Sequence, residues 1–239
     1  MKRSFKLGAM AVACAAGVMV SAGAANFTSS ADRLHEVGLF QGTGMTASGA
    51  PQYDLDRAPT RAEAAVMLVR LLGKEADAKA LTYTAPFTDL EGWEAPYVQY
   101  LYDNKLTTGA TATTFEPKAK CSAQMYTTFL LRSLGYSDAQ NGDFAYTGAL
   151  DFAADHVGLI DESFCDTNNF LRDNVAAMSL EALATPVKAT DITLLDKLIA
   201  DGAIDQIKAA PLSQFIDLAE SYNKAVSTPI TRAEQDVTA

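Results

Sequence analysis

The 239-residue sequence has few of the residues that metal and redox chemistry use. It contains three cysteines, two histidines and one tryptophan. Cys121 and Cys165 lie outside any Cys-x-x-Cys pair, so we expect no zinc site and no other metal. In an exported chain these two cysteines could form a disulfide. They could equally be two buried thiols, because each precedes a candidate helix by a few residues.

Basic runs and catalytic motifs are also missing. The formal net charge is −10, and no basic run of the nucleic-acid-binding kind follows the first residues, so we expect no nucleic-acid partner. Binding of an acidic polymer would have to come from local pockets, since the overall charge repels it. No Gly-x-Ser-x-Gly, His-Glu-x-x-His or phosphate-binding loop occurs. We therefore expect no enzyme, no catalytic residue and no cofactor.

Residues 1–25 have the pattern of a secretory signal peptide. Lys2, Arg3 and Lys6 precede an apolar run from Leu7 to Val20, and small-residue cleavage patterns follow at 22–25. The apolar run is too short and too rich in alanine for a membrane span. The mature chain is therefore expected to be secreted, with no transmembrane span.

The most informative stretch is residues 59–73, which predicts one complete helix. Thr60 and Glu63 have the spacing of a capping box, and Gly73 suits the C-terminal end. Arg61 stands in the first turn, where the helix dipole disfavours a cation, so local helix stability does not explain it. An arginine beside free N–H groups at a helix N-terminus predicts a site for an anion.

This unit of helix, loop and capped helix occurs three times. Aligning Ser122 with Thr60 places Arg132 on Arg70 without a gap. A third, more divergent copy places Arg172 on Arg61. The first helices end in Gly38-Leu39, Lys105-Leu106 and Gly158-Leu159, and the capped helices begin near Thr60, Ser122 and Leu171. Such units must pack on one another to complete a core.

The motifs resemble those of the S-layer homology (SLH) domain. They are Phe87-Thr88-Asp89-Leu90, Trp93 three residues on, the Gly-Leu ends, the Phe115-Glu116-Pro117 loop and Thr60-Arg61-Ala62-Glu63. On this basis we divide the chain into a signal peptide (1–25), repeat 1 (26–80), repeat 2 (81–137), repeat 3 (138–187) and a helical C-terminal tail (188–239). In the tail, helices are expected at 191–200 and from Pro211 towards Val226, and Thr231-Arg232-Ala233-Glu234 is read as a chance match.

The resemblance implies an all-α fold with the three repeats in a pseudo-threefold arrangement around a central bundle. We expect the three Gly-Leu helices to meet at the centre. It also implies non-catalytic anchoring at the cell wall or cell surface of a Gram-positive-type bacterium. Grooves between repeats would bind an acidic secondary cell wall polysaccharide, often one that bears ketal-linked pyruvate. An alternative is a module that docks other surface proteins, and a wall-active hydrolase is a third reading.

Five residues are the candidate binding residues under this resemblance. Arg61 and Arg172 would offer a guanidinium and helix N–H groups to a carboxylate. Trp93 would be the platform for a sugar ring, Asp89 would accept sugar hydroxyls or position an arginine, and Gly109 would let backbone approach the ligand. The competing readings are a solvated Arg61, a core Trp93, a helix-capping Asp89 and a turn at Gly109.

The three grooves are not expected to be equivalent. Repeat 2 has Ala123 where the family has arginine, and tryptophan occurs in repeat 2 alone. A groove that combines Arg61 with the 87–93 segment would have both a cation and a platform. We therefore predict one strong site at most, with one weak companion at best.

Overall fold

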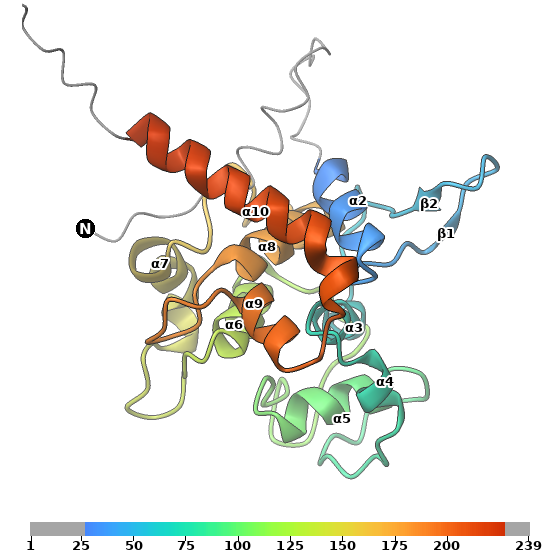
Figure 1. The fold of residues 1–239 in the computed structure, drawn as a ribbon. Coiled ribbons are helices and arrows are strands. Elements are labelled where there is room, and N and C mark those ends of the chain that lie inside the picture. The colour runs from blue at the N-terminus through green and yellow to red at the C-terminus, as the bar shows by residue number, and fades with distance from the viewer. Residues whose placement is uncertain (1–26, 228–239) are drawn as a thin grey trace, which may run out of the picture.

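The computed structural model describes residues 27–227, with side chains up to residue 222, and shows a mostly helical protein as predicted (Figure 1). The predicted signal peptide and the Thr231–Glu234 stretch lie outside the described residues. The helices are α2 (Thr28–Glu36), α3 (Arg61–Leu71), α4 (Glu75–Lys79), α5 (Ala95–Asp103), α6 (Ala123–Ser133), α7 (Ala149–Asp151), α8 (Arg172–Ala184), α9 (Leu194–Ala200) and α10 (Gln206–Ser227). A 3-10 turn, η1 (Tyr146–Gly148), precedes α7, and a π-helical segment, η2 (Phe152–Val157), follows it.

Helix α3 begins as its sequence predicts. The Glu63 N–H donates to Thr60 Oγ1 at 3.2 Å, and the Thr60 N–H donates to Glu63 Oε2 at 2.7 Å. This is the reciprocal capping box, which satisfies two N–H groups that the helix itself cannot. In repeat 2, Ser122 Oγ accepts the N–H of Met125 at 3.2 Å in the same position.

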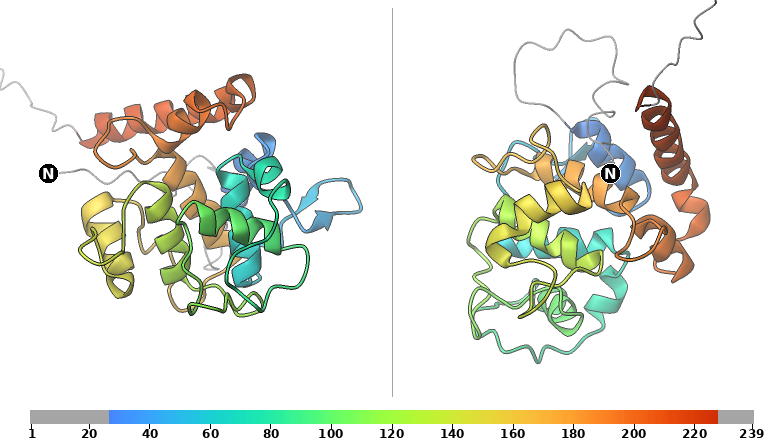
Figure 2. Two further views of the ribbon diagram at one scale, coloured as in Figure 1. Left: turned by 90° about the horizontal axis from the view of Figure 1, so that it is seen from below. Right: turned by 90° about the vertical axis from the view of Figure 1, so that its left-hand side faces the viewer.

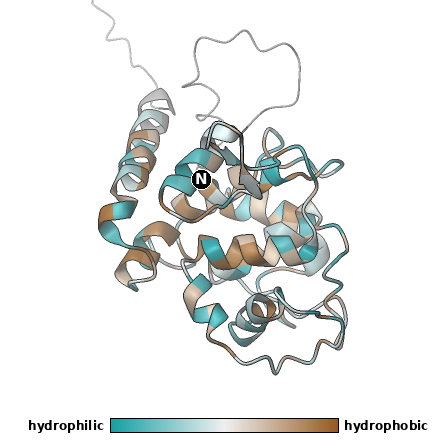
Figure 3. Cartoon of the chain, turned by 90° about the vertical axis from the view of Figure 1, so that its right-hand side faces the viewer, coloured by the Kyte–Doolittle hydropathy of each residue, from teal (hydrophilic) through white to brown (hydrophobic). Residues whose placement is uncertain are grey.

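The centre of the molecule is formed by the capped helices. Helices α3, α6 and α8 contact one another, and α5, α7 and α2 pack outside them on α3, α6 and α8, respectively. The expectation that the Gly-Leu helices meet at the centre is therefore wrong. Burial shows the same arrangement, because every residue of the 13-residue α8 is buried, whereas α2 buries three of its nine residues. Figure 3 shows hydrophobic residues concentrated on helices in the middle of the body.

The packing order links the predicted repeats in a cycle. Each first helix packs on the capped helix of the preceding repeat, and α2 of repeat 1 packs on α8 of repeat 3. The residue before the leucine at the end of each first helix also has the same backbone conformation. Its φ is left-handed in all three cases, with 83° at Gly38, 59° at Lys105 and 76° at Gly158. The pseudo-threefold arrangement and the repeat boundaries stay predictions.

A short hairpin projects from the segment between α2 and α3. Strands β1 (Gly44–Met45) and β2 (Pro51–Gln52) pair antiparallel and form the one sheet among the described residues. Figures 1 and 2 show this arm standing away from the helices. The sequence predicted a Gly- and Ser-rich loop there, and no central sheet is found in the described part of the chain, in agreement with the all-α prediction.

The C-terminal tail packs along the body. Helix α9 contacts α8, and α10 contacts α2 and α9 (Figure 2). Between α2 and α10, the Arg33 guanidinium carbon lies 3.7 Å from the Phe215 ring centroid. Helix α10 begins at Gln206 and contains Pro211, so the prediction that it starts at Pro211 is wrong. Helix α9 begins at Leu194 behind the capping residue Thr193. Among the described residues, no helix combines the length and apolar character that a membrane crossing requires.

The two cysteines of the described chain are free and buried. Burial raises the pKa of Cys121 to about 12 and that of Cys165 to about 11. The sequence left open a disulfide or two buried thiols, and the structure shows two buried thiols.

Candidate functional site

A pocket of about 420 Å³ lies beside the start of α3 and is the candidate site. We call it the Arg61 pocket. Its walls come from three predicted repeats: Arg61 of α3, the loop and helix α6 of repeat 2, and Tyr146 of repeat 3. It is lined by Arg61, Thr107, Thr108, Gly109, Ala110, Glu116, Met125, Thr128, Phe129, Arg132, Asp138 and Tyr146. Its size lies within the usual range of small-ligand sites, roughly 300–1,000 Å³.

Arg61 is half-buried and held by Phe115 and Met125. Its Nε donates to the carbonyl of Phe115 at 2.7 Å, and one Nη1 hydrogen points to Met125 Sδ at 2.9 Å. Among the described residues, Nη2 has no hydrogen-bond partner. The guanidinium is therefore fixed through one edge and keeps donors for a ligand, which is the arrangement that binds a carboxylate well.

Asp89 lies behind Arg61 and organises the backbone that holds it. Its two carboxylate oxygens accept the N–H groups of Phe115 at 2.8 Å and Glu116 at 2.7 Å. Burial alone would raise the pKa of Asp89, but the backbone hydrogen bonds, together with the charge of Arg61, outweigh it, and the pKa lies below its ordinary value. Asp89 is absent from the pocket lining, so its geometry is that of a positioning residue.

Gly109 lines the pocket in a backbone conformation that favours glycine. Its φ is +83°, and an added Cβ would lie 2.3 Å from Phe87 Cε1 and 2.5 Å from the Thr111 carbonyl oxygen. A side chain therefore fits neither the backbone conformation nor the space. This glycine allows the 107–111 backbone to turn tightly beside the pocket.

A second arginine in the pocket wall is already neutralised. Arg132 donates from Nε and Nη2 to both oxygens of Asp138, at 2.8 and 2.7 Å, and from Nη1 to the Leu106 carbonyl at 2.8 Å. Its side chain is 9% exposed. Because all its principal donors are engaged, Arg61 is the cation in this pocket that remains open to a ligand.

The first N–H groups of α3 and α8 are not free to bind an anion. The expectation that these helix N-termini form an anion site is therefore wrong. The N–H groups of Arg61 and Ala62 donate to the carbonyls of Ala119 and Pro117, at 2.8 and 3.1 Å. In α8, the N–H groups of Arg172 and Asp173 donate to the carbonyls of Arg57 and Leu55, both at 3.0 Å. Loop carbonyls of a neighbouring repeat thus occupy the donors that an anion would need.

Arg172 makes the same type of contact as Arg61 but is buried away from solvent. Its Nε donates to the Tyr53 carbonyl at 2.8 Å and its Nη2 to the Gln41 carbonyl at 3.3 Å. The residue is 4% exposed, and its guanidinium carbon lies 5.5 Å from the Phe40 ring centroid. Burial lowers the pKa of Arg172 from its ordinary value. The structure does not bring Arg172 into the Arg61 pocket.

Trp93 also lies outside the Arg61 pocket, and Tyr146 and the buried Phe129 are the aromatic residues found there. Trp93 is 60% exposed, so it is not a core residue. Tyr146 precedes Leu159 by the same 13 residues that separate Trp93 from Leu106. That spacing was the signal in the sequence that could have identified Tyr146 as the equivalent aromatic of repeat 3.

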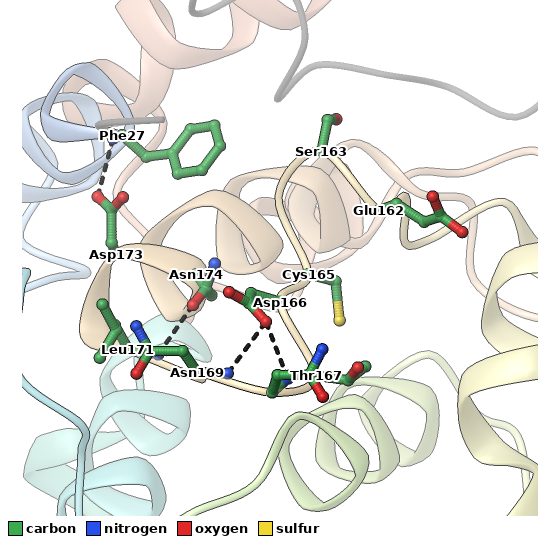
Figure 4. A pocket seen from close by; sticks show the side chains of 11 residues that line it. Phe27, Glu162, Ser163, Cys165, Asp166, Thr167, Asn169, Leu171, Asp173 and Asn174 are labelled. Carbon is green, nitrogen blue, oxygen red and sulfur yellow. Dashed lines mark hydrogen bonds between the residues drawn. The ribbon is translucent and has the colours of Figure 1, made fainter. Parts of the chain in front are cut away.

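A larger polar pocket of about 510 Å³ lies beside the start of α8 and has no arginine or lysine in its lining (Figure 4). Asp173 lies in its wall and accepts the Phe27 N–H at 2.8 Å. Burial raises the pKa of Asp173 to about 6, although the hydrogen bond from Phe27 lowers it. No group of three or more His, Cys, Asp or Glu side chains suited to a metal ion occurs in the described chain.

Comparison with known proteins identifies one matching region and three relatives. Residues 86–122 match the S-layer homology domain. The chain is 28% identical over 109 residues to an endoglucanase of Bacillus sp. (strain KSM-635), a match that covers 41% of this chain and 12% of the relative. It is 30% identical over 112 residues both to a middle cell wall protein of Brevibacillus brevis (strain 47 / JCM 6285 / NBRC 100599) and to a surface layer protein of Brevibacillus choshinensis.

The last two matches each cover 46% of this chain and 10% of the relative. The chain therefore spans about a tenth of the length of the curated relatives it matches. Residues 86–122 are thus a region of S-layer homology in a chain that is similar to cell wall and surface layer proteins of bacteria.

Proposed function

We propose that the protein is a non-catalytic anchor that attaches to the bacterial cell surface by binding an acidic secondary cell wall polysaccharide. The S-layer homology of residues 86–122 and the similarity to wall and surface layer proteins support the cell-surface role. The observation that carries the proposal is the Arg61 guanidinium. It is fixed on one edge by Phe115 and keeps open donors inside a pocket lined by hydroxyl groups.

The chemistry of the pocket fits an acidic sugar. A carboxylate, such as that of a pyruvate ketal, would accept hydrogen bonds from Arg61. The exposed hydroxyl of Thr108 and the exposed carboxylate of Glu116 line the same pocket and can exchange hydrogen bonds with sugar hydroxyls. Binding of this kind needs no covalent step, no cofactor and no metal.

The proposal includes one strong site per chain. Arg172 is buried against the backbone of repeat 1, and the corresponding position of repeat 2 is the buried Ala123. The grooves at Arg172 and at Ala123 therefore have no solvent-accessible cation in the position of Arg61. We also propose that residues 26–80, 81–137 and 138–187 are three SLH repeats related by a pseudo-threefold axis. The cyclic packing of α2, α5 and α7 on α8, α3 and α6 supports this arrangement.

A surface protein-interaction module is the second candidate, and helix α10 favours it. Ile207, Leu218 and Tyr222 of this helix are 85%, 67% and 55% exposed. Exposed apolar side chains on one helix are a common feature of docking surfaces. Under this reading the partner would be another surface protein.

The deciding experiment is co-sedimentation of the purified protein with Gram-positive wall sacculi, before and after chemical removal of the polysaccharide. We expect binding that disappears with the polysaccharide. Binding that survives removal would overturn the proposal and indicate a protein or peptidoglycan partner.

The matched variants are Arg61→Ala and Lys118→Ala. Loss of a charge-assisted contact costs about 1.5–3 kcal/mol, so Arg61→Ala should weaken binding roughly tenfold or more. Its thermal stability should fall little, because the two contacts that are lost, to the Phe115 carbonyl and to Met125 Sδ, are only partly buried. Lys118 is exposed and outside the pocket, so Lys118→Ala removes the same charge and should bind as the parent does. Unchanged binding by folded Arg61→Ala would exclude the assigned role.

A further inference from the structure

We propose that Tyr146 is the specificity-determining residue of the Arg61 pocket and supplies the surface against which the ring of one acidic sugar unit lies. This inference rests on the proposed function of the pocket. It goes beyond it by assigning the ring contact to a residue of repeat 3, outside the matched region 86–122. It also assigns no ligand contact to Trp93, the tryptophan that the sequence favoured.

The placement of Tyr146 is the first argument. Its backbone carbonyl accepts a hydrogen bond from Gln124 Nε2 on α6, which fixes the start of η1 against repeat 2. Its side chain lines the Arg61 pocket and is 46% exposed. No partner for its hydroxyl is found among residues 27–222. An anchored backbone with a free aromatic ring at a pocket wall is suited to contact with a ligand.

The chemistry of the pocket is the second argument. An acidic sugar has a carboxylate and also an apolar ring face of C–H groups. Arg61 suits the carboxylate, and an aromatic ring presents a large, rigid apolar surface with a polar tip for the ring face. The other aromatic in the lining, Phe129, is 3% exposed, which leaves Tyr146 as the aromatic surface of this pocket that a sugar can reach.

The electrostatic coupling of the two side chains agrees with this placement. Burial raises the pKa of Tyr146, and the positive charge of Arg61 opposes that rise, so the phenol and the guanidinium lie near enough to influence each other. The site consequently needs three predicted repeats at once: Arg61 of repeat 1, Thr107–Ala110 of repeat 2 and Tyr146 of repeat 3.

The test is titration of a pyruvylated wall fragment into the purified full chain and four variants. Tyr146→Ala should weaken binding about tenfold, since it removes the ring contact. Tyr146→Phe keeps the ring and should stay within about threefold of the parent. Trp93→Ala is the matched control, because Trp93 has the same repeat position but lies outside the pocket. It should leave binding unchanged. The fourth variant, Arg61→Ala, reports on the proposed function itself.

A second titrant separates ring contact from general damage. Free pyruvate has the carboxylate without the sugar ring, so its weak binding should be equal in the parent and in Tyr146→Ala. If folded Tyr146→Ala binds the fragment as the parent does, or if Trp93→Ala loses as much affinity, the inference is wrong. In that case, a loss of fragment affinity in Arg61→Ala would still support the proposed function. If neither the parent nor any variant binds the fragment, both the proposed function and this inference are overturned.

Discussion

Arg61 Nε and the carbonyl oxygen of Phe115 are joined by a 2.7 Å hydrogen bond across 54 residues of sequence. The same Phe115 donates its N–H to Asp89 at 2.8 Å. The orientation of the guanidinium therefore depends on a carboxylate that lies outside the Arg61 pocket. Arg172 and Tyr53 form the equivalent bond at 2.8 Å in another groove, where the guanidinium is closed off from solvent.

Asp89→Asn is expected to reduce ligand affinity through this chain of contacts, without removing a ligand contact. Asparagine retains one acceptor oxygen, so one of the two N–H groups of Phe115 and Glu116 loses its partner. Titration of the pyruvylated wall fragment measures the affinity, and the melting temperatures of parent and variant between pH 7 and pH 3 report on the Asp89 charge.

The sign of the pH effect follows from the lowered pKa of Asp89. A carboxyl with a depressed folded pKa contributes stability above its unfolded pKa of about 3.9, and this is lost as the pH falls through the folded pKa. The parent should be the more stable protein at neutral pH, and the difference should shrink in acid. A constant difference across this range would contradict the role given to the Asp89 charge.

Arg172→Ala is expected to lower the stability of the fold without removing a side chain from the Arg61 pocket. The variant leaves the buried Tyr53 carbonyl without its donor, and the part-buried contact with the Gln41 carbonyl is also lost. Each unsatisfied buried group costs about 1–3 kcal/mol, so the free energy of unfolding should fall by about that amount or more. Urea denaturation measures the loss, and Arg61→Ala is the comparison. Arg172 would be misassigned if its variant were as stable as Arg61→Ala and had lost the same affinity.

Gly109→Ala is expected to lower both stability and ligand affinity. The new Cβ would lie 2.3 Å from Phe87 Cε1, in a residue with φ of +83°. Backbone strain in this region costs about 1–3 kcal/mol, and the clash displaces the 107–111 loop at the pocket. Gly92→Ala is the matched control, because Gly92 also has positive φ, +105°, but its Cβ meets nothing within 4 Å. Equal affinities for the two variants would show that the close contact at Gly109 is unimportant for binding.

Asp173→Asn is expected to stabilise the protein at neutral pH. Burial raises the pKa of Asp173 to about 6. Folding therefore favours the protonated form, and the stability that this gives is complete below about pH 4 and lost as the pH rises through 6. Asparagine keeps an oxygen for the Phe27 N–H and has no charge to bury. Thermal unfolding at pH 7 should show a gain on the order of 1 kcal/mol, which vanishes near pH 4. A less stable variant at pH 7 would contradict this assignment.

Short-range patterns in the sequence determined the elements of this protein. The capping box of Thr60 and Glu63 is formed within four consecutive residues, and the structure has it as predicted. The hydrophobic spacing of α3 and α6 and the turn at Gly109 are local in the same sense. The position of Arg61 at the start of α3 could also be read directly, because a helix boundary is set by its neighbours in sequence.

Tertiary structure decided which of these elements form the pocket. It placed the capped helices at the centre, occupied the N–H groups of Arg61 and Arg172 with loop carbonyls, closed Arg172 and left Arg61 open. It also put Tyr146 in the Arg61 pocket instead of Trp93. These outcomes depend on contacts between residues that are 54 to 131 positions apart. Two arginines with the same local sequence position therefore differ in exposure, because the loops that pack on them come from different parts of the chain.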